Sequence, residues 1–357
     1  MVKCRYVLVG IGWLVLTFCK PNNRASETRS TKFLNEPLVS EIYTADPSAH
    51  VFENRIYVYP SHDINSERIP GDCGSQYSMT DYTVFSMDSI GGPVTLHEVA
   101  LPLKEVPWAK RMLWAADAAT KNGKYYLYFP AKDKEDVFRI GVAVSNRPEG
   151  PFTAQPTFIE GSYSIDPAVF EDEDGSFYMY FGGIWGGQVQ HWDKNKYTPA
   201  DCDKKDNEQP NAPAIGPRIV KLSEDMLGFS EEVKEIQIVD SDGSPILTKD
   251  NDKRFFEAAW MHKRNGQYYL SYSTGDTHYI VYAMSDNPYG PFTFKGILNH
   301  PVKGWTNHHS VVEIKGKWYL FYHDIQLSNQ TNLRNVKVAE IFYNNDGTMK
   351  ALNTLIE

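Results

Sequence analysis

The sequence predicts an all-β protein, a five-bladed β-propeller whose blades are four-stranded antiparallel sheets. The first observation behind this prediction is a pattern that occurs five times: an apolar segment, a polar turn, and a strand rich in alternating aromatic residues. The copies span residues 45–59, 114–128, 164–181, 256–272 and 308–322. They lie 69, 52, 91 and 50 residues apart, measured at Tyr57, Tyr126, Tyr178, Tyr269 and Tyr319. Each interval has room for a four-stranded sheet, and radial repetition of such sheets makes a propeller.

The second observation is the residue type at one equivalent position of each copy. Eleven or twelve residues before the aligned tyrosines stand Asp46, Trp114, Asp166, Glu257 and His308. If equivalent strands line the axis of the propeller, these five side chains converge at one end of it. Three of the five are carboxylates.

Length and charge limit the kinds of partner. With 357 residues and 41% hydrophobic content, the chain can bury a large core, and the five spread repeats indicate one domain rather than two. The net charge of −9 argues against nucleic acid and other polyanions, because the field of the protein would repel them. Neutral ligands remain, and an aromatic content of 13% suits both packed sheets and the apolar faces of sugars.

The beginning of the chain predicts export. Residues 1–19 have a short basic start and an apolar run that is too short to span a membrane, so they read as a signal peptide. The run ends at Cys19 in a sequence that resembles a lipoprotein cleavage box, although Phe18 stands where a small residue is usual. We therefore expect either a periplasmic protein or an outer-membrane lipoprotein. Residues 20–35 read as a polar tether, and residues 36–357 as a single propeller domain.

Two cysteines lie in polar insertions of the predicted mature chain. Cys73 and Cys202 could form a disulfide in an exported protein, and the sequence leaves this open. No pair or cluster of cysteines and histidines has the spacing of a zinc site.

Taken in chain order, the blades contain further candidates. The segment 36–43 could supply the strand that closes the ring against the end of the chain. Asp63 follows the first aromatic strand and could be a turn residue or a site residue, of which we favour the turn residue. Trp185 stands among four glycines in residues 181–187, which fits a sugar platform or tight packing between blades, and we favour the platform. Residues 142–152 resemble residues 281–292, which supports equivalent blades two and four.

Three carboxylates around one axis point to acid–base chemistry. Hydrolysis of a glycosidic bond needs a protonated carboxyl for the leaving oxygen and an ionised carboxylate on the other side. The alternative is that Asp46 and Asp166, each followed by proline, only begin extended segments. Glu257 has no such proline and stands in an apolar context, which should raise its pKa as a general acid requires. His308 alone would more often be a hydrogen-bonded core histidine.

The triple set Ala45-Asp46-Pro47, Ser164-Ile165-Asp166-Pro167 and Phe256-Glu257-Ala258 resembles glycoside hydrolase family 43, the five-bladed propeller enzymes that remove xylose or arabinofuranose with inversion. The resemblance covers nearly the whole chain after residue 19. It implies that Asp46 is the general base, Asp166 the modulator of pKa and orientation, and Glu257 the general acid. Ala116 departs from the family, which usually has proline there, and this affects a loop only.

The resemblance also implies ligands. It suggests a calcium ion on the axis near His308, no organic cofactor, and Trp114 and Trp185 as walls of the sugar subsites. It also suggests Arg334 as a residue that reaches the sugar, for which the alternative is a surface salt bridge. Calcium prefers oxygen ligands, so His308 would need waters around the ion.

The expected function is an exo-acting, inverting β-xylosidase that releases xylose from the non-reducing ends of xylo-oligosaccharides. The close alternative is an α-L-arabinofuranosidase or an enzyme with both activities. A different class is a sugar-binding propeller without catalysis. The expected partner is a neutral xylo- or arabino-oligosaccharide, with no nucleic acid, and with membrane contact only through an N-terminal lipid.

Overall fold

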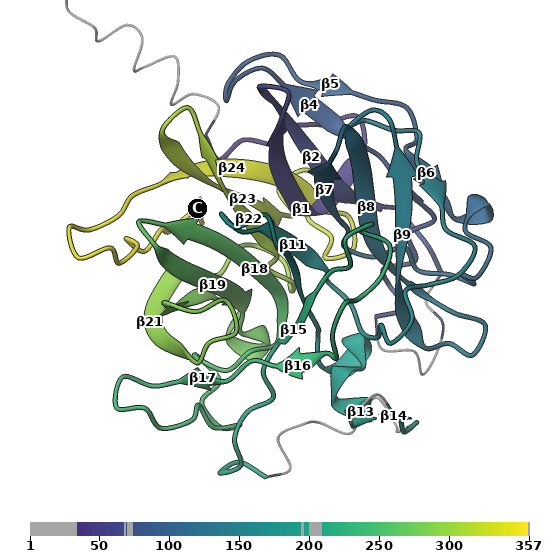
Figure 1. Ribbon diagram of the computed structural model, residues 1–357. Helices are drawn as coiled ribbons and strands as arrows, with labels where there is room; N and C mark the ends of the chain where they lie inside the picture. The colour runs from purple at the N-terminus through teal and green to yellow at the C-terminus, as the bar shows by residue number, and fades with distance from the viewer. Residues whose placement is uncertain (1–33, 68, 70–73, 194–195, 200–208, 356–357) are drawn as a thin grey trace, which may run out of the picture.

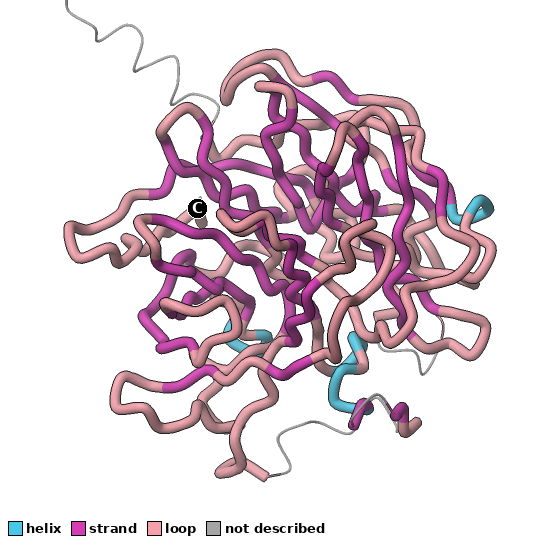
Figure 2. Tube along the Cα trace, viewed as in Figure 1, coloured by secondary structure: helices cyan, strands magenta, loops and turns pink. Residues whose placement is uncertain are grey.

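The computed structural model describes residues 34–67, 69, 74–193, 196–199 and 209–355. The leader and almost all of the tether predicted from the sequence, together with Cys19, Cys73 and Cys202, lie outside these residues. Within them the chain is built of strands and loops with four short 3-10 turns (Figure 2), and no helix is long and apolar enough to cross a membrane. These turns are η1 (Leu103–Glu105), η2 (Trp185–Gly187), η3 (Val189–His191) and η4 (Gly275–Thr277).

Five sheets surround a common axis, so the predicted propeller is confirmed. The innermost strands are β1 (Tyr43–Phe52), β7 (Asp117–Lys121), β11 (Ala168–Glu171), β18 (Glu257–Arg264) and β22 (His309–Ile314). They lie near the middle of the view in Figure 1, and each contacts the innermost strands of the two neighbouring sheets. The contacts close a ring in the order β1, β7, β11, β18 and β22.

Blade one is a four-stranded sheet whose outer strands are interrupted. Next to β1 lies β2, and β2 pairs with both β3 and β4. Strand β3 then pairs with β6, and β4 pairs with β5. The strands are β2 (Arg55–Asp63), β3 (Asp81–Tyr82), β4 (Phe85–Met87), β5 (Thr95–Leu96) and β6 (Leu101–Pro102).

Blades two to four keep four antiparallel strands each. Their strands beyond the innermost ones are β8 (Lys124–Lys132), β9 (Phe138–Ser145) and β10 (Thr153–Ala154) in blade two; β12 (Phe177–Phe181), β15 (Arg218–Lys221) and β16 (Lys234–Glu235) in blade three; and β19 (Gln267–Ser273), β20 (Ile280–Ser285) and β21 (Phe292–Asn299) in blade four. A fifth strand, β17 (Ile238–Val239), adds to blade four in parallel with β21. A separate hairpin, β13 (Trp192–Asp193) and β14 (Lys196–Tyr197), lies in the insertion before β15.

Blade five is completed by the beginning of the described chain. Its own strands are β22, β23 (Lys317–Asp324) and β24 (Asn335–Ile341). Along the free edge of β24, the backbone N–H groups of Asn35 and Leu38 donate to the carbonyl oxygens of Val338 and Val336, at 2.8 and 2.9 Å. The segment before β1 therefore closes the ring, as the sequence predicted, and the edge of β24 is not left unpaired.

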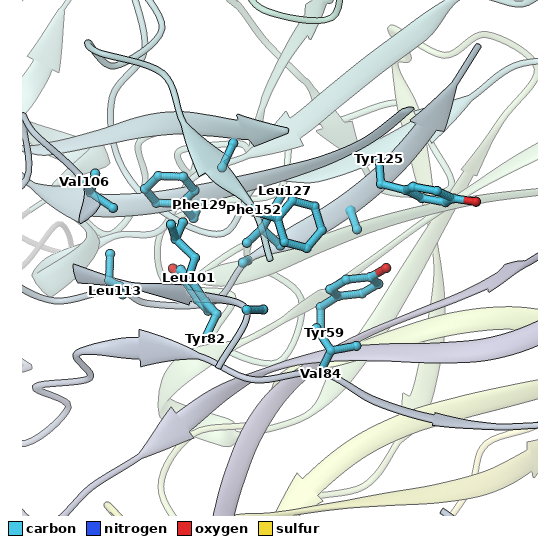
Figure 3. Packing of buried hydrophobic residues seen from close by; sticks show 14 of the residues in the cluster. Tyr59, Tyr82, Val84, Leu101, Val106, Leu113, Tyr125, Leu127, Phe129 and Phe152 are labelled. Atoms are coloured by element: carbon cyan, nitrogen blue, oxygen red, sulfur yellow. The ribbon is translucent and has the colours of Figure 1, made fainter. Parts of the chain in front are cut away.

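The hydrophobic core lies between neighbouring blades. Figure 3 shows the cluster between blades one and two, where Tyr59 and Tyr82 of one sheet pack with Leu127 and Phe129 of the next and with Phe152. All five side chains are buried. This is why the sequence repeats aromatic strands: the second strand of each blade fills the space between sheets, and burial of each such side chain stabilises the fold by about 1.5–3 kcal/mol.

Asp117 joins three innermost strands at the axis. It stands at the start of β7, and its Oδ1 accepts hydrogen bonds from His50 Nε2, at 2.6 Å, and from the Ser48 hydroxyl, both on β1. Its Oδ2 accepts from the backbone N–H of Val169 on β11, at 2.5 Å. Because the buried carboxylate binds groups on both neighbouring innermost strands, it fixes the relative positions of blades one, two and three.

Candidate active site

A cavity of about 470 Å³ lies at the end of the axis where the innermost strands begin. This location follows from the chain: Asp46 lies near the start of β1, Glu257 is the first residue of β18, and His308 immediately precedes β22. The lining includes all seven side chains that the sequence singled out, namely Asp46, Trp114, Asp166, Trp185, Glu257, His308 and Arg334. The five-fold repeat therefore does bring its equivalent positions together.

The backbone at the carboxylates is irregular. Strand β1 has a register shift between Ala45 and Ser48, and β18 has one next to Glu257, so Asp46 and Glu257 both lie at β-bulges. Asp46 and Asp166 adopt left-handed backbone conformations with φ of 48° and 57°. Bulges redirect side chains at strand ends, and left-handed φ is costly for residues other than glycine, so the fold stabilises these conformations at the cavity.

Asp46 is held as an anion. Its Oδ1 accepts a hydrogen bond of 2.9 Å from Nη1 of Arg334. Burial alone would raise the pKa of Asp46, but the positive charge of Arg334, with contributions from His323 and His308, lowers it to about 2. Asp46 is consequently ionised at neutral pH and able to accept a proton.

Two hydrogen bonds of the His323 ring fix the backbone at Asp46. The N–H of Asp46 donates to His323 Nδ1 at 3.0 Å, so the ring proton resides on Nε2, which donates to the carbonyl oxygen of Thr306 at 3.1 Å. Burial, and then the charge of Arg334, lower the pKa of His323 to about 3, so the ring is neutral. The sequence did not single out His323 or Thr306.

Asp166 and Glu257 form a pair of carboxyl groups with raised pKa. Burial, followed by the negative charges of Glu257 and Asp46, raises the pKa of Asp166 well above its usual range. Burial and the charge of Asp46 raise the pKa of Glu257 to about 8. The pair therefore retains a proton at neutral pH. Asp166 Oδ2 accepts the backbone N–H of Ala258 at 2.9 Å, which favours the ionised form of Asp166, whereas the half-buried Glu257 faces the cavity.

Arg334 is a buried residue of the cavity, 3% exposed, and not part of a surface salt bridge. Besides Asp46 it binds Asp63 through two side-chain hydrogen bonds of 2.8 Å and one from its backbone N–H, also 2.8 Å. Its guanidinium lies 4.5 Å from the ring centre of Tyr77 and donates to the Thr306 hydroxyl at 3.0 Å. These contacts leave the guanidinium one orientation.

The prediction that Asp63 is a turn residue was wrong. Asp63 ends β2 with its side chain buried against Arg334. In the hairpin of blade one it pairs with Tyr43, at the start of β1, so it lies at the same end of the axis as Asp46. The register of that hairpin was the signal that could have located it.

The two tryptophans line the cavity in different ways. Trp114 is 9% exposed, donates from Nε1 to the carbonyl oxygen of Tyr77 at 2.6 Å, and packs on Phe138 with ring centres 4.6 Å apart. A Cβ at Gly74 would approach the Trp114 ring to 2.5 Å, so the glycine is required for this close packing. Trp114 is therefore a buried wall of the cavity that packs on Phe138 and Gly74.

Trp185 stands at the start of η2, with its ring edge-on to Phe256 at 5.1 Å. The glycines beside it serve packing, because a Cβ at Gly183 or Gly187 would meet Ile165 at 2.6 or 2.8 Å. Both interpretations of residues 181–187 therefore apply, each to a different part of the segment. Gly183 and Gly187 allow tight packing on Ile165, and the Trp185 indole lines the cavity.

His308 lies between two of the carboxylates. Its Nδ1 is 3.7 Å from Asp46 Oδ1 and 3.8 Å from Asp166 Oδ2. Burial lowers the pKa of His308 to about 4, so the imidazole is neutral. Within the described ranges, no group of three or more His, Cys, Asp or Glu side chains is arranged to hold a metal ion.

One ionised carboxylate and a proton-bearing pair facing one cavity on a propeller axis define a glycoside hydrolase. The model of the glycosyl hydrolases family 43 matches residues 37–349, and the chain belongs to this family.

Among its relatives, a xylosidase/arabinosidase 43A of Humicola insolens is 58% identical over 87% of this chain and 97% of its own length. A xylosidase/arabinosidase of Bacteroides ovatus is 51% identical over 87% and 95%. Among solved structures, a family 43 β-xylosidase/α-arabinofuranosidase from a compost microbial metagenome, in complex with xylotriose and in a calcium-free form, is 64% identical with a TM-score of 0.88, covering 90% of this chain and 98% of that one.

Proposed function

We propose that this chain is an exo-acting β-xylosidase that releases xylose from the ends of xylo-oligosaccharides and also accepts α-L-arabinofuranosides. The observation that carries the proposal is the opposite protonation of Asp46 and Glu257 in one cavity, with pKa values of about 2 and about 8. The relatives that are named xylosidase/arabinosidase support the choice of sugars. A cavity of about 470 Å³ suits the end of a chain, since pockets for small ligands measure roughly 300–1,000 Å³.

The proposed mechanism uses the residues in the roles that the sequence suggested. Glu257 donates its proton to the glycosidic oxygen as the bond from that oxygen to the anomeric carbon breaks. A water molecule attacks the anomeric carbon from the opposite face and gives its proton to the Asp46 carboxylate. The product is a sugar of inverted configuration, and the enzyme returns to its starting state when Asp46 loses and Glu257 regains a proton.

Asp166 acts through Glu257 in this proposal. Its carboxylate binds the backbone N–H of Ala258, the residue after Glu257, and so orients the acid. Because the two buried carboxyl groups lie close together, ionisation of both is unfavourable, and the pair keeps a proton that Glu257 can donate. Trp114, Trp185 and Arg334 are proposed to surround the terminal sugar, with Nη2 of Arg334 donating to one of its hydroxyl groups.

The test is a comparison of nitrophenyl β-xyloside, α-L-arabinofuranoside and β-galactoside with the purified protein. Hydrolysis of the first two and not of the third supports the proposal. Activity on the arabinofuranoside alone favours the arabinofuranosidase alternative. Binding of xylotriose without hydrolysis of any of the three would indicate a sugar-binding propeller and would overturn the mechanism.

The calcium ion expected near His308 stays a proposal. Calcium takes about six to eight oxygen ligands, and the described residues do not supply such a set at His308, so most ligands would be waters. We therefore derive no catalytic step through a metal. Calorimetric titration of the chelator-treated protein with calcium tests the site: binding that is lost in His308→Ala supports it, and no binding refutes it.

Export is likewise proposed on residues 1–19 alone. Mass spectrometry of the mature protein from a bacterial host separates the alternatives, because a lipid on Cys19 adds the mass of acyl chains that a simply secreted protein lacks.

A further inference from the structure

Among the described residues that line the cavity, Trp305 is the one large apolar side chain that is exposed. Its exposed fraction is 40%, whereas the other aromatic side chains of the lining are buried or half-buried. An indole left open to water beside a ligand cavity is a candidate contact surface.

The Trp305 ring is held by three neighbouring rings. His278 and Phe256 contact it at steep angles, with ring centres 5.2 and 6.0 Å away, and Trp185 lies tilted at 6.1 Å. These three contacts fix the plane of the ring, and the 40% of the side chain that stays exposed is the surface available to a ligand.

The backbone around Trp305 is also anchored. The ring of His278 hydrogen-bonds to the backbone of Trp305, and Asn307 Nδ2 donates to the His278 carbonyl oxygen at 2.8 Å. The preceding Gly304 has a φ of 121°, a conformation that favours glycine and allows the sharp turn before the indole. The position of Trp305 is therefore set before a ligand binds, which limits the entropic cost of binding.

Trp305 lies on the side of Glu257. It contacts Phe256, the residue before Glu257, and Trp305 and Glu257 line the same cavity. In the proposed hydrolysis Glu257 protonates the oxygen of the leaving group, so the departing sugar must lie next to Glu257 on its solvent side. Trp305 is the exposed aromatic surface at that place.

We propose that Trp305 is the platform for the leaving-group sugar, the second xylose residue of a neutral xylo-oligosaccharide. The indole face would stack on the apolar C–H face of the pyranose, which needs no charge on the ligand. The inference rests on the proposed β-xylosidase function and names the part of the substrate that the carboxylates do not touch.

The experiment compares xylotriose with β-xylosyl fluoride, which has a fluoride in place of a leaving sugar. In Trp305→Ala, kcat/KM for xylotriose relative to that for xylosyl fluoride should fall about ten-fold, equivalent to about 1.4 kcal/mol, mainly through KM. Trp305→Phe keeps an aromatic face and should recover most of the ratio. Phe342→Ala, which removes an aromatic side chain that is 52% exposed and outside the cavity lining, is the matched control and should leave the ratio unchanged.

Equal losses on both substrates would show that Trp305 only supports the reacting end of the cavity, and no loss on either would show that it contacts nothing. Both results overturn the proposal. Calorimetric binding of xylotriose to Glu257→Gln, with and without Trp305→Ala, gives a readout without hydrolysis. If the wild-type protein hydrolyses neither substrate, the proposed function fails. In that case, weaker xylotriose binding in Trp305→Ala would still support Trp305 as a sugar contact, and unchanged binding would refute it.

Discussion

Arg334 and Asp63 face each other across two parallel hydrogen bonds, from Nε to Oδ2 and from Nη2 to Oδ1, each 2.8 Å long. The pair is buried beneath the cavity and leaves Nη1 of Arg334 to bind Asp46. Because a two-point contact fixes the guanidinium plane, Asp63 determines the position of the charge that keeps Asp46 ionised.

We expect Asp63→Asn to lower kcat/KM on nitrophenyl β-xyloside by about 10²-fold, the cost of misplacing a group by about 1 Å. The amide cannot accept both hydrogen bonds, so Arg334 loses its fixed plane. Steady-state kinetics measure the effect. Asp88→Asn, at a carboxylate that is 87% exposed, serves as control, and equal activity of the two variants would show that Asp63 does not position Arg334.

Glu257→Ala should separate substrates by their leaving groups. Without a general acid, hydrolysis of xylobiose should fall by about 10²–10⁴-fold, whereas dinitrophenyl β-xyloside, whose leaving group needs no proton, should lose far less. The ratio of the two rates is the measurement. Glu224→Ala, at a side chain that is 93% exposed, is the control; a uniform loss on both substrates in Glu257→Ala would contradict the acid role.

The pH profile of kcat/KM should be broad on the acidic side and limited on the basic side. The lowered pKa of Asp46, about 2, keeps the base ionised until the pH approaches that value, although protonation of His308 near pH 4 adds positive charge beside it. The raised pKa of Glu257, about 8, means that the acid loses its proton, and activity falls, as the pH rises through 8. The control is the pH profile of the residual activity of Glu257→Gln. If kcat/KM of this variant still falls as the pH rises through 8, the loss of activity at high pH belongs to another group.

The stereochemical course gives a further test. We expect the carboxyl groups of Asp46 and Glu257 to be roughly 6.5–9.5 Å apart, which leaves room for the attacking water and gives inversion. Proton NMR of early hydrolysis of a β-xyloside should then show α-xylose first. β-Xylose as the first product would mean retention, for which the separation should be about 5 Å.

The sequence alone determined the ring of sheets and the carboxylates at its end. Five aromatic strands with equivalent neighbours need only local alternation and spacing, which are visible in the chain, and the same alignment identified Asp46, Asp166 and Glu257. The apolar surroundings of Glu257 even predicted the direction of its pKa, because burial is the largest cause of that shift.

Only the tertiary structure decided how Asp46 is charged and what holds Arg334. Asp63 and Asp46 are 271 and 288 residues away from Arg334 in sequence, and no local pattern marks the pairing. The contacts form because the segment before β1 closes the ring against β24, which carries the end of the chain to its beginning. Charge interactions act through space at a few ångströms, so the protonation of these groups follows from the closed ring and not from their order in the chain.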